Sequence, residues 1–172
     1  AVLFAYHEVG AAALDAMLRN KIDVVAVFTH RDDPSEGGWF RSVAMAAAKH
    51  GIPVHAPDDI NHPIWIERVR DMGPDVLVSA HYRKMIGSDM LDVCPNHCYN
   101  IHASMLPKYR GRCPINWALV NGETETGVTL HHMTVAADAG DIVAQQSVVI
   151  DDDDTAAILT ARIVEATGSM LD

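Results

Sequence analysis

The sequence has few cysteines and no long apolar run, and each absence excludes a class of protein. Its three cysteines are Cys94, Cys98 and Cys113. So small and odd a number does not provide a disulfide framework, which favours a reducing compartment over secretion. No apolar run approaches the ~20 residues that a membrane-spanning helix needs. We therefore expect a protein of the cytoplasm with no membrane partner.

Basic residues are also scarce. The 172 residues include 13 lysines and arginines against 23 aspartates and glutamates, which gives a formal net charge of −10. Such a chain repels polyanions at long range, so we do not expect nucleic acid or an anionic membrane surface as a partner. A local basic patch remains compatible with binding a small anion.

The composition is typical of one folded domain. The length lies within the ~100–200 residues of a single domain, and 49% apolar and 21% charged residues match globular proteins. No repeat or linker divides the chain, so we expect one domain over residues 1–172. Because the first residue is not Met and the chain stops just after a predicted helix, we expect the natural chain to be longer.

The first half alternates strand-like apolar runs with helical stretches. The runs are apolar at successive positions, as strands covered on both faces must be. The alternation predicts a mostly parallel sheet with right-handed crossovers. We expect strands over residues 1–6, 23–29, 53–56 and 75–80 and helices over residues 11–20, 40–49 and 64–72.

The second half predicts longer strands and a final helix. The acidic run 151–154 before Thr155 is typical of a helix start, where side-chain oxygens cap free N–H groups and oppose the helix dipole. The following helix is predicted to bury a stripe made of Ile158, Ile163, Ala166 and Met170. We expect strands over residues 98–101, 126–133 and 142–150 and a short helix over residues 114–120.

Several ligand-binding motifs are absent. Neither G-x-G-x-x-G nor G-x-x-x-x-G-K-[ST] occurs, which argues against NAD and P-loop chemistry. Gly10, in the first strand-to-helix turn, either forms a plain tight turn or lets a ligand approach the helix. Cys94-x-x-x-Cys98 lacks a second pair of metal ligands, and His131-His132 alternates faces on a strand, so we expect no metal.

Asn100 and His102 form the clearest candidate site. They lie two apart on a predicted strand, so both side chains face the same side, and the strand ends at the usual ligand edge of an open α/β sheet. Three cations follow, Lys108, Arg110 and Arg112, before a predicted helix N-terminus. Guanidinium groups and a helix dipole together favour a phosphate or carboxylate ligand.

This segment carries a family resemblance. The run N-I-H-A-S-M-L-P-K-Y-R-G, residues 100–111, closely resembles the signature of the 10-formyltetrahydrofolate-dependent formyltransferases. Residues 136–142 look like the family's D-x-G loop, and residues 121–130 are also similar. The run departs from the signature at Ala103 and Met105, which we interpret as packing positions. The resemblance implies a Rossmann-like three-layer α/β fold with a mostly parallel sheet and mixed C-terminal strands.

The resemblance also implies roles for individual residues. Asn100 and His102 would donate to the oxyanion that forms during formyl transfer, and Asp138 would orient His102 and raise its pKa. The acceptor's diphosphate would bind near Gly10 and Arg110. The co-substrate 10-formyltetrahydrofolate would contact Tyr82, Lys84, Met85, Ile86, Arg112, Thr134, Val135, Ala136, Ala137 and Asp138.

Four short segments suggest an acceptor. They resemble formyltransferase domains that act on UDP-4-amino-4-deoxy-L-arabinose in lipid A modification and polymyxin resistance. Such domains are followed by a small β subdomain and can be fused to a dehydrogenase-decarboxylase domain, and a homo-oligomer is also compatible. The segments are F-A-Y-H at residues 4–7, F-T-H at 28–30, H-P-I-W at 62–65 and N-W-A-L-V-N-G at 116–122.

Other functions stay open. Another nucleotide-linked amino sugar, glycinamide ribonucleotide and methionyl-tRNA are alternative acceptors, because shared motifs do not determine the acceptor. The net charge of −10 and the acidic segment 31–38 weigh against tRNA. A folate-binding module without catalysis is the alternative outside enzymes. The joint presence of Asn100, His102 and Asp138 argues against it.

Overall fold

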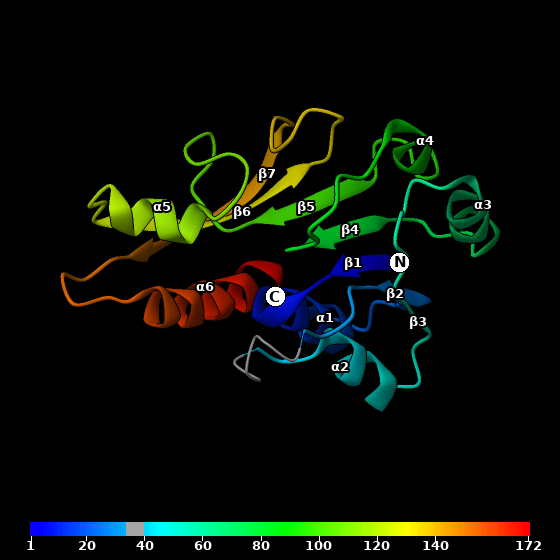
Figure 1. Ribbon diagram of the computed structural model, residues 1–172, viewed down its shortest axis with the longest axis horizontal. Coiled ribbons are helices and arrows are strands. Elements are labelled where there is room, and N and C mark those ends of the chain that lie inside the picture. The colour runs from blue at the N-terminus through cyan, green and yellow to red at the C-terminus, as the bar shows by residue number, and fades with distance from the viewer. Residues whose placement is uncertain (34–39) are drawn as a thin grey trace.

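The structure, a computed structural model, describes residues 1–33 and 40–172 (Figure 1). In these ranges seven strands form one sheet in the order β3-β2-β1-β4-β5-β6-β7. The first five strands in this order pair in parallel. The sixth strand pairs antiparallel with both of its neighbours. The strands are β1 (Val2–Ala5), β2 (Ala26–Phe28), β3 (Val54–His55), β4 (Leu77–Ala80), β5 (Cys98–His102), β6 (Glu125–His132) and β7 (Ile142–Val149).

Helices cover both faces of this sheet. The helices α1, α2, α5 and α6 pack on one face, whereas α3 and α4 pack on the other. Figure 1 shows α1 beside α6 below the sheet and α3 and α4 at its other side. The helices are α1 (His7–Arg19), α2 (Val43–Lys49), α3 (Pro63–Asp71), α4 (Ser88–Leu91), α5 (Pro114–Val120) and α6 (Ala156–Leu171). The predicted three-layer α/β fold with a mostly parallel, C-terminally mixed sheet is confirmed.

The alternation of side chains along β1 explains the layering. Val2 and Phe4 are fully buried against α3 and α4, and Leu3 and Ala5 are fully buried against α1 and α2. Because successive strand residues point to opposite faces, a strand covered on both faces must be apolar throughout. The same alternation directs Asn100 and His102 of β5 to the face that carries α3 and α4.

Two helices differ from the prediction. Helix α1 begins at His7, before the predicted Ala11, because it follows β1 with almost no connecting loop. In α6, Ile163 and Ala166 are buried as predicted, but Leu159 is fully buried in place of Ile158, which is 45% exposed. The short helix α4 was not predicted. The N-cap of α6 is Thr155, whose side chain accepts a hydrogen bond from the N–H of Ile158, and not one of the acidic residues 151–154 that were expected to cap it.

The sheet order locates the ligand edge. β1 lies between β2 and β4, so the chain leaves β1 in one direction for β2 and β3 and returns on the other side as β4. In open α/β sheets, ligands bind outside the carboxyl ends of the strands at such a reversal. In the described part of the chain, no helix combines the length and apolar character required to cross a membrane.

Candidate active site

The register between β5 and β6 gathers polar side chains at the carboxyl end of β5. His131 of β6 lies directly opposite Asn100, and Thr129 lies opposite His102. Opposed residues of an antiparallel pair project from the same face. The four side chains therefore face the same side as α3 and α4, beyond the part of the sheet that these helices cover.

Asp138, from the loop between β6 and β7, joins this group. Its Oδ1 accepts a hydrogen bond from Asn100 Nδ2 at 3.2 Å and lies 3.4 Å from His131 Nε2. Its Oδ2 accepts the backbone N–H of Gly111 at 2.8 Å and lies 3.5 Å from His102 Nδ1. The carboxylate thus links two strands and two loops, and the predicted Asn100, His102 and Asp138 are brought together.

His131 is the member of this cluster that the sequence analysis missed. Its Nδ1 lies 2.8 Å from the carbonyl oxygen of His132, which only accepts, so Nδ1 carries a proton. Its Nε2 lies 3.1 Å from Asn100 Nδ2. This nitrogen accepts from Asn100 when the ring is neutral and donates to Asp138 when the ring is protonated. His131 is only 2% exposed, so the contacts are shielded from water.

Burial decides the charge of His102. Its pKa lies below the ordinary value because burial disfavours the charged ring, although Asp138 and the carbonyl oxygen of Tyr109 act in the opposite direction. Asp138 raises the pKa of His102 as predicted, but burial outweighs it, so the net shift of the pKa is downward. Nε2 of His102 lies 2.8 Å from the Tyr109 carbonyl oxygen and carries the proton. Nδ1, which faces Asp138, is then free of a proton.

Asp138 is ionised. Burial raises its pKa, but the hydrogen bond with His131, the positive charge that His102 gains in acid and the N–H of Gly111 outweigh burial and leave the pKa below its ordinary value. The residue has φ of 48°, in the left-handed region. Asp tolerates this region better than most residues because of its short polar side chain. The unusual backbone aims the carboxylate back at β5.

The loop that follows β5 is held by β6. Ser104 donates from Oγ to the Lys108 carbonyl at 2.6 Å, and its own carbonyl accepts from Thr129 Oγ1 at 2.6 Å. Thr129 Oγ1 in turn accepts the N–H of Leu106 at 3.2 Å. Ala103 is fully buried, in agreement with its interpretation as a packing position. The loop that follows β5, residues 103–111, which we call the signature loop, is thus held in place by the buried side chains of Ser104 and Thr129.

The three cations of the loop do not form one anion site. Lys108 is paired with Glu123, with Nζ 3.1 Å from Oε2. Arg110 is exposed and lies outside the cavity described below, so its prediction as an acceptor-binding residue finds no support in its position. Arg112 alone of the three lines the cavity. The helix that follows begins at Pro114, as predicted, with Cys113 as its N-cap.

A cavity of about 660 Å³ opens beside the polar cluster. Asn100, His102, His131 and Asp138 all contribute to its wall. Val135 and Ala136 are exposed in the loop before Asp138 and do not line it. Of the other residues predicted to bind the co-substrate, those in the wall are Tyr82, Lys84, Met85, Ile86, Arg112, Thr134 and Ala137.

The wall continues onto the other face of the sheet. There it is formed by the first turn of α1, including His7 and Glu8, together with Phe40, the first turn of α5 and Thr160 of α6. His7 and Phe40 stack with their ring centroids 4.1 Å apart. The polar cluster thus adjoins one wall on the face of α3 and α4 and another on the face of α1, α5 and α6.

Gly10 has a packing role and lies outside the wall. It is buried, and a Cβ at this position would lie 3.0 Å from Ala5 Cβ and 3.2 Å from the Ala80 carbonyl oxygen. Glycine is therefore required for the close approach of α1 to β1 and β4. The placement of the acceptor near Gly10 stays a prediction, since the neighbouring His7, Glu8 and Val9 line the cavity.

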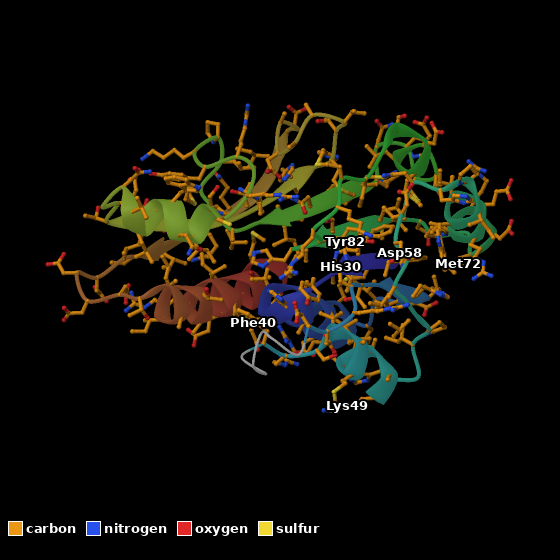
Figure 2. The ribbon with its side chains drawn as sticks, in the orientation of Figure 1. His30, Phe40, Lys49, Asp58, Met72 and Tyr82 are labelled. Atoms are coloured by element: carbon orange, nitrogen blue, oxygen red, sulfur yellow. The ribbon has the colours of Figure 1, made fainter. Side chains whose placement is uncertain are left out.

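Histidines follow the carboxyl ends of several parallel strands. His7 follows β1, His30 follows β2, and His81 follows β4. His30 stacks on Tyr82 with ring centroids 4.4 Å apart, and both are labelled in Figure 2. Burial, assisted by nearby positive charges, lowers the pKa of His30 and of His81 to about 4. In the sequence, each of these three histidines stands just after an apolar run, and this position is the signal by which they could have been found.

Metal coordination is not supported by the arrangement of the ten histidines. Within residues 1–33 and 40–172, no three or more histidine, cysteine, aspartate or glutamate side chains are placed to hold an ion. Cys94 and Cys98 are buried, and the Cys98 thiol lies 3.2 Å from the Cys94 carbonyl oxygen. These thiols serve as small apolar side chains.

Known proteins share this architecture. The sequence profile of the formyl transferases matches residues 1–171. Glycinamide ribonucleotide transformylase 1 from Symbiobacterium toebii is 25% identical, with a TM-score of 0.83 over 98% of this chain and 81% of that one. Phosphoribosylglycinamide formyltransferase from Bacillus halodurans is 26% identical, with a TM-score of 0.83 over 98% and 89%. The sugar 3N-formyl transferase WlaRD, solved with dTDP and 5-N-formyl-THF, shares the fold at 22% identity, with a TM-score of 0.78 over 99% and 59%.

Proposed function

The chain belongs to the formyl transferase family, and we propose that it transfers a formyl group from 10-formyltetrahydrofolate to the 4-amino group of UDP-4-amino-4-deoxy-L-arabinose. The protein is a formyl-transferring enzyme, and the family uses a formyltetrahydrofolate as co-substrate. The proposal concerns the acceptor and the roles of the site residues. These roles are supported by the convergence of Asn100, His102, His131 and Asp138 in the wall of one cavity of about 660 Å³.

Donors are needed where negative charge develops. When the acceptor nitrogen attacks the formyl carbon, a C–N bond forms and the formyl oxygen gains negative charge. The Asn100 amide and the His102 imidazole are the donors we assign to this oxygen. Both are preorganised by protein acceptors, since Asn100 Nδ2 donates to Asp138 and His102 Nε2 donates to the Tyr109 carbonyl. In the reaction, each of these two N–H groups leaves its acceptor in the protein and donates its hydrogen bond to the oxyanion.

Proton transfer completes the reaction. The bond from the formyl carbon to folate N10 breaks, the attacking nitrogen loses a proton and N10 gains one, so protons balance. His102 is neutral in the free enzyme and has an unprotonated Nδ1 beside the ionised Asp138. A proton taken up there is stabilised by the carboxylate, and the ring then serves as the general acid toward N10.

The two walls receive the two substrates in this proposal. The co-substrate lies against residues 82–86, where Ile86 is buried while the Met85 side chain is 56% exposed. Thr134 and Arg112 border the same region. The acceptor lies against the start of α1 and Phe40. The formyl carbon and the acceptor nitrogen then meet at Asn100 and His102.

The choice of acceptor has its own support. The segments F-A-Y-H and H-P-I-W at residues 4–7 and 62–65 resemble enzymes of the UDP-aminopentose, and the first of them contributes His7 to the wall. The net charge of −10 disfavours tRNA. Glycinamide ribonucleotide is the second candidate, because two matched enzymes at 25% and 26% identity are named for that substrate.

A competition between acceptors tests the proposal. The enzyme is incubated with 10-formyltetrahydrofolate and, in separate reactions, the UDP-aminopentose, glycinamide ribonucleotide or methionyl-tRNA, and the formylated product is quantified by mass spectrometry. The proposal expects the highest kcat/KM with the UDP-aminopentose. A higher value with glycinamide ribonucleotide would replace the proposed acceptor. Binding of the folate without any product would support the non-catalytic module.

A further inference from the structure

Two side chains tie the loop that follows β4 to a distant segment. We call residues 82–87 the donor loop and residues 57–61 the clamp segment. The donor loop has no helix or strand of its own, and the clamp segment follows β3. β3 and β4 are separated in the sheet by β2 and β1, so pairing between strands does not hold these segments together. Their contact depends on side chains.

Asn61 makes the first tie with both ends of its amide group. Its Nδ2 donates to the Met85 carbonyl at 3.0 Å, and its Oδ1 accepts the N–H of Gly87 at 2.7 Å. The side-chain amide thus satisfies one backbone carbonyl and one backbone N–H of the donor loop, as a neighbouring strand would do in a sheet. Gly87 permits this approach, because a Cβ there would lie 3.0 Å from Asn61 Oδ1.

Lys84 makes the second tie in the opposite direction. Its ammonium donates to the carbonyl oxygens of Pro57, at 3.1 Å, and Asp58. The Lys84 side chain therefore extends toward the clamp segment, although the residue lines the cavity. Asp58 and Tyr82 are labelled in Figure 2 and mark the two connected segments.

The clamp segment is itself anchored. Ile60 is fully buried in the core cluster that includes Ile86 of the donor loop. Asn61 is further oriented by its own N–H, which donates to Asp59 Oδ1 at 2.9 Å. The side chain that holds the donor loop is therefore fixed on a packed base. Its restraint applies to the backbone around Met85 and Ile86, at the wall proposed for the co-substrate.

From these contacts we infer that Asn61 and Lys84 are positioning residues that hold the donor loop ready for the folate. The inference rests on the proposed function, because it assumes that the folate binds at this loop. A loop ordered beforehand loses less conformational entropy when the ligand binds. Loss of either tie should therefore weaken folate binding and raise the KM for the formyl donor, while kcat and the KM for the acceptor change much less.

Two pairs of variants separate positioning from general stability. Asn61→Ala removes both amide hydrogen bonds, and Asn20→Ala is its control. Asn20 is also a surface asparagine whose amide donates to backbone carbonyls, those of Ala16 and Leu171, on the far end of α1. Lys84→Met removes the ammonium, whereas Lys84→Arg retains a cation that can donate to the same carbonyls.

The readout is direct binding of 5-formyltetrahydrofolate by calorimetry, together with the two KM values, kcat and the melting temperature. Loss of both amide hydrogen bonds should weaken folate binding roughly tenfold or more in Asn61→Ala. We expect folate binding to be weakened in Lys84→Met and weakened less in Lys84→Arg. Asn20→Ala should keep wild-type folate affinity even where its melting temperature falls as far as that of Asn61→Ala.

The outcomes separate this inference from the proposed function. Wild-type folate affinity in both Asn61→Ala and Lys84→Met would overturn the inference and leave the proposed function intact. A wild-type enzyme that binds no formylfolate would overturn the proposed function first. Equal weakening in Asn61→Ala and Asn20→Ala would assign the effect to stability and reject positioning. A loss of kcat with an unchanged donor KM would also reject it.

Discussion

The backbone N–H of Gly111 donates to Oδ2 of Asp138 at 2.8 Å. This bond joins the end of the signature loop to the loop between β6 and β7. Because the donor is a backbone group, no substitution at residue 111 other than proline removes it directly. Gly111 has φ of 91°, which favours glycine. The geometry of the carboxylate therefore depends on a backbone conformation.

Removal of either proposed oxyanion donor should reduce turnover strongly. We expect Asn100→Ala and His102→Ala each to lower kcat by ~10²–10³, the usual cost of one such donor. A formyl-transfer assay under saturating substrates measures this effect. Thermal unfolding serves as the control, since both side chains are on a paired strand. Near wild-type turnover in a folded variant would refute the assignment.

His131 should matter for kcat although it is not an assigned donor to the substrate. His131→Ala removes a hydrogen-bond partner of Asn100 Nδ2 and a neighbour of Asp138 Oδ1. Misplacement of catalytic groups by a fraction of an ångström to 1 Å costs up to ~10²-fold, so we expect kcat to fall by roughly 10- to 100-fold with little change in either KM. His132→Ala is the neighbouring control. Comparable losses in both variants would argue against a specific role for His131.

Acid should destabilise the protein between about pH 6.5 and 4. His30 and His81 have folded-state pKa values of about 4 because burial disfavours their charged forms. In the unfolded chain a histidine titrates near 6.5. The unfolded state therefore binds more protons throughout this window, and the free energy of unfolding falls as the pH is lowered. Above the window both states are neutral and the contribution is complete.

Urea denaturation at pH 7.5, 6 and 5 tests this dependence. The double variant His30→Gln/His81→Asn should show a flatter pH dependence than the wild type. Asparagine suits position 81, where φ is 54°. Asp138, whose pKa is lowered, titrates mainly below this window and does not mask the effect. Parallel pH dependences in the two proteins would contradict the prediction.

Gly10→Ala should reduce stability by about 1–3 kcal/mol, the usual cost of overpacking a close contact. The added Cβ would meet Ala5 Cβ at 3.0 Å and the Ala80 carbonyl oxygen at 3.2 Å. Gly168→Ala is the matched control. Gly168 lies within α6, and a Cβ there would meet only Arg19 Nη2, at 3.6 Å. There alanine should stabilise by roughly 0.5–1 kcal/mol. Denaturant titration distinguishes the two, and a neutral Gly10→Ala would show that α1 can shift.

Local pattern was enough to predict the strands and the pair formed by Asn100 and His102. Their spacing of two along β5 is a property of the strand alone. Helix α5 was also predictable, because proline begins it and Asn121-Gly122 follows it. The core residue Ile163 followed from periodicity, whereas the choice between Ile158 and Leu159 depended on the packing of α6 against its neighbours.

The remaining parts of the site depend on contacts between distant segments. The place of His131 required the register of β5 against β6. The direction of the Lys84 side chain required the position of Pro57 and Asp58. The charge of His102 depends on two opposed effects on its pKa, since burial lowers the pKa and Asp138 raises it. The size of each effect is set by the surroundings of the ring and not by the residue type. A sequence pattern does not contain these distances.

The separation of the cavity into two walls has an evolutionary consequence. The polar cluster comes entirely from residues 100–138, whereas the wall assigned to the acceptor includes His7, Glu8 and Phe40 from the first part of the chain. Mutations in the early segment can therefore accumulate without touching the groups that perform the chemistry. Divergence of this segment can change the acceptor wall while the reactive groups stay the same, and a hybrid gene that exchanges it between relatives would separate the two contributions.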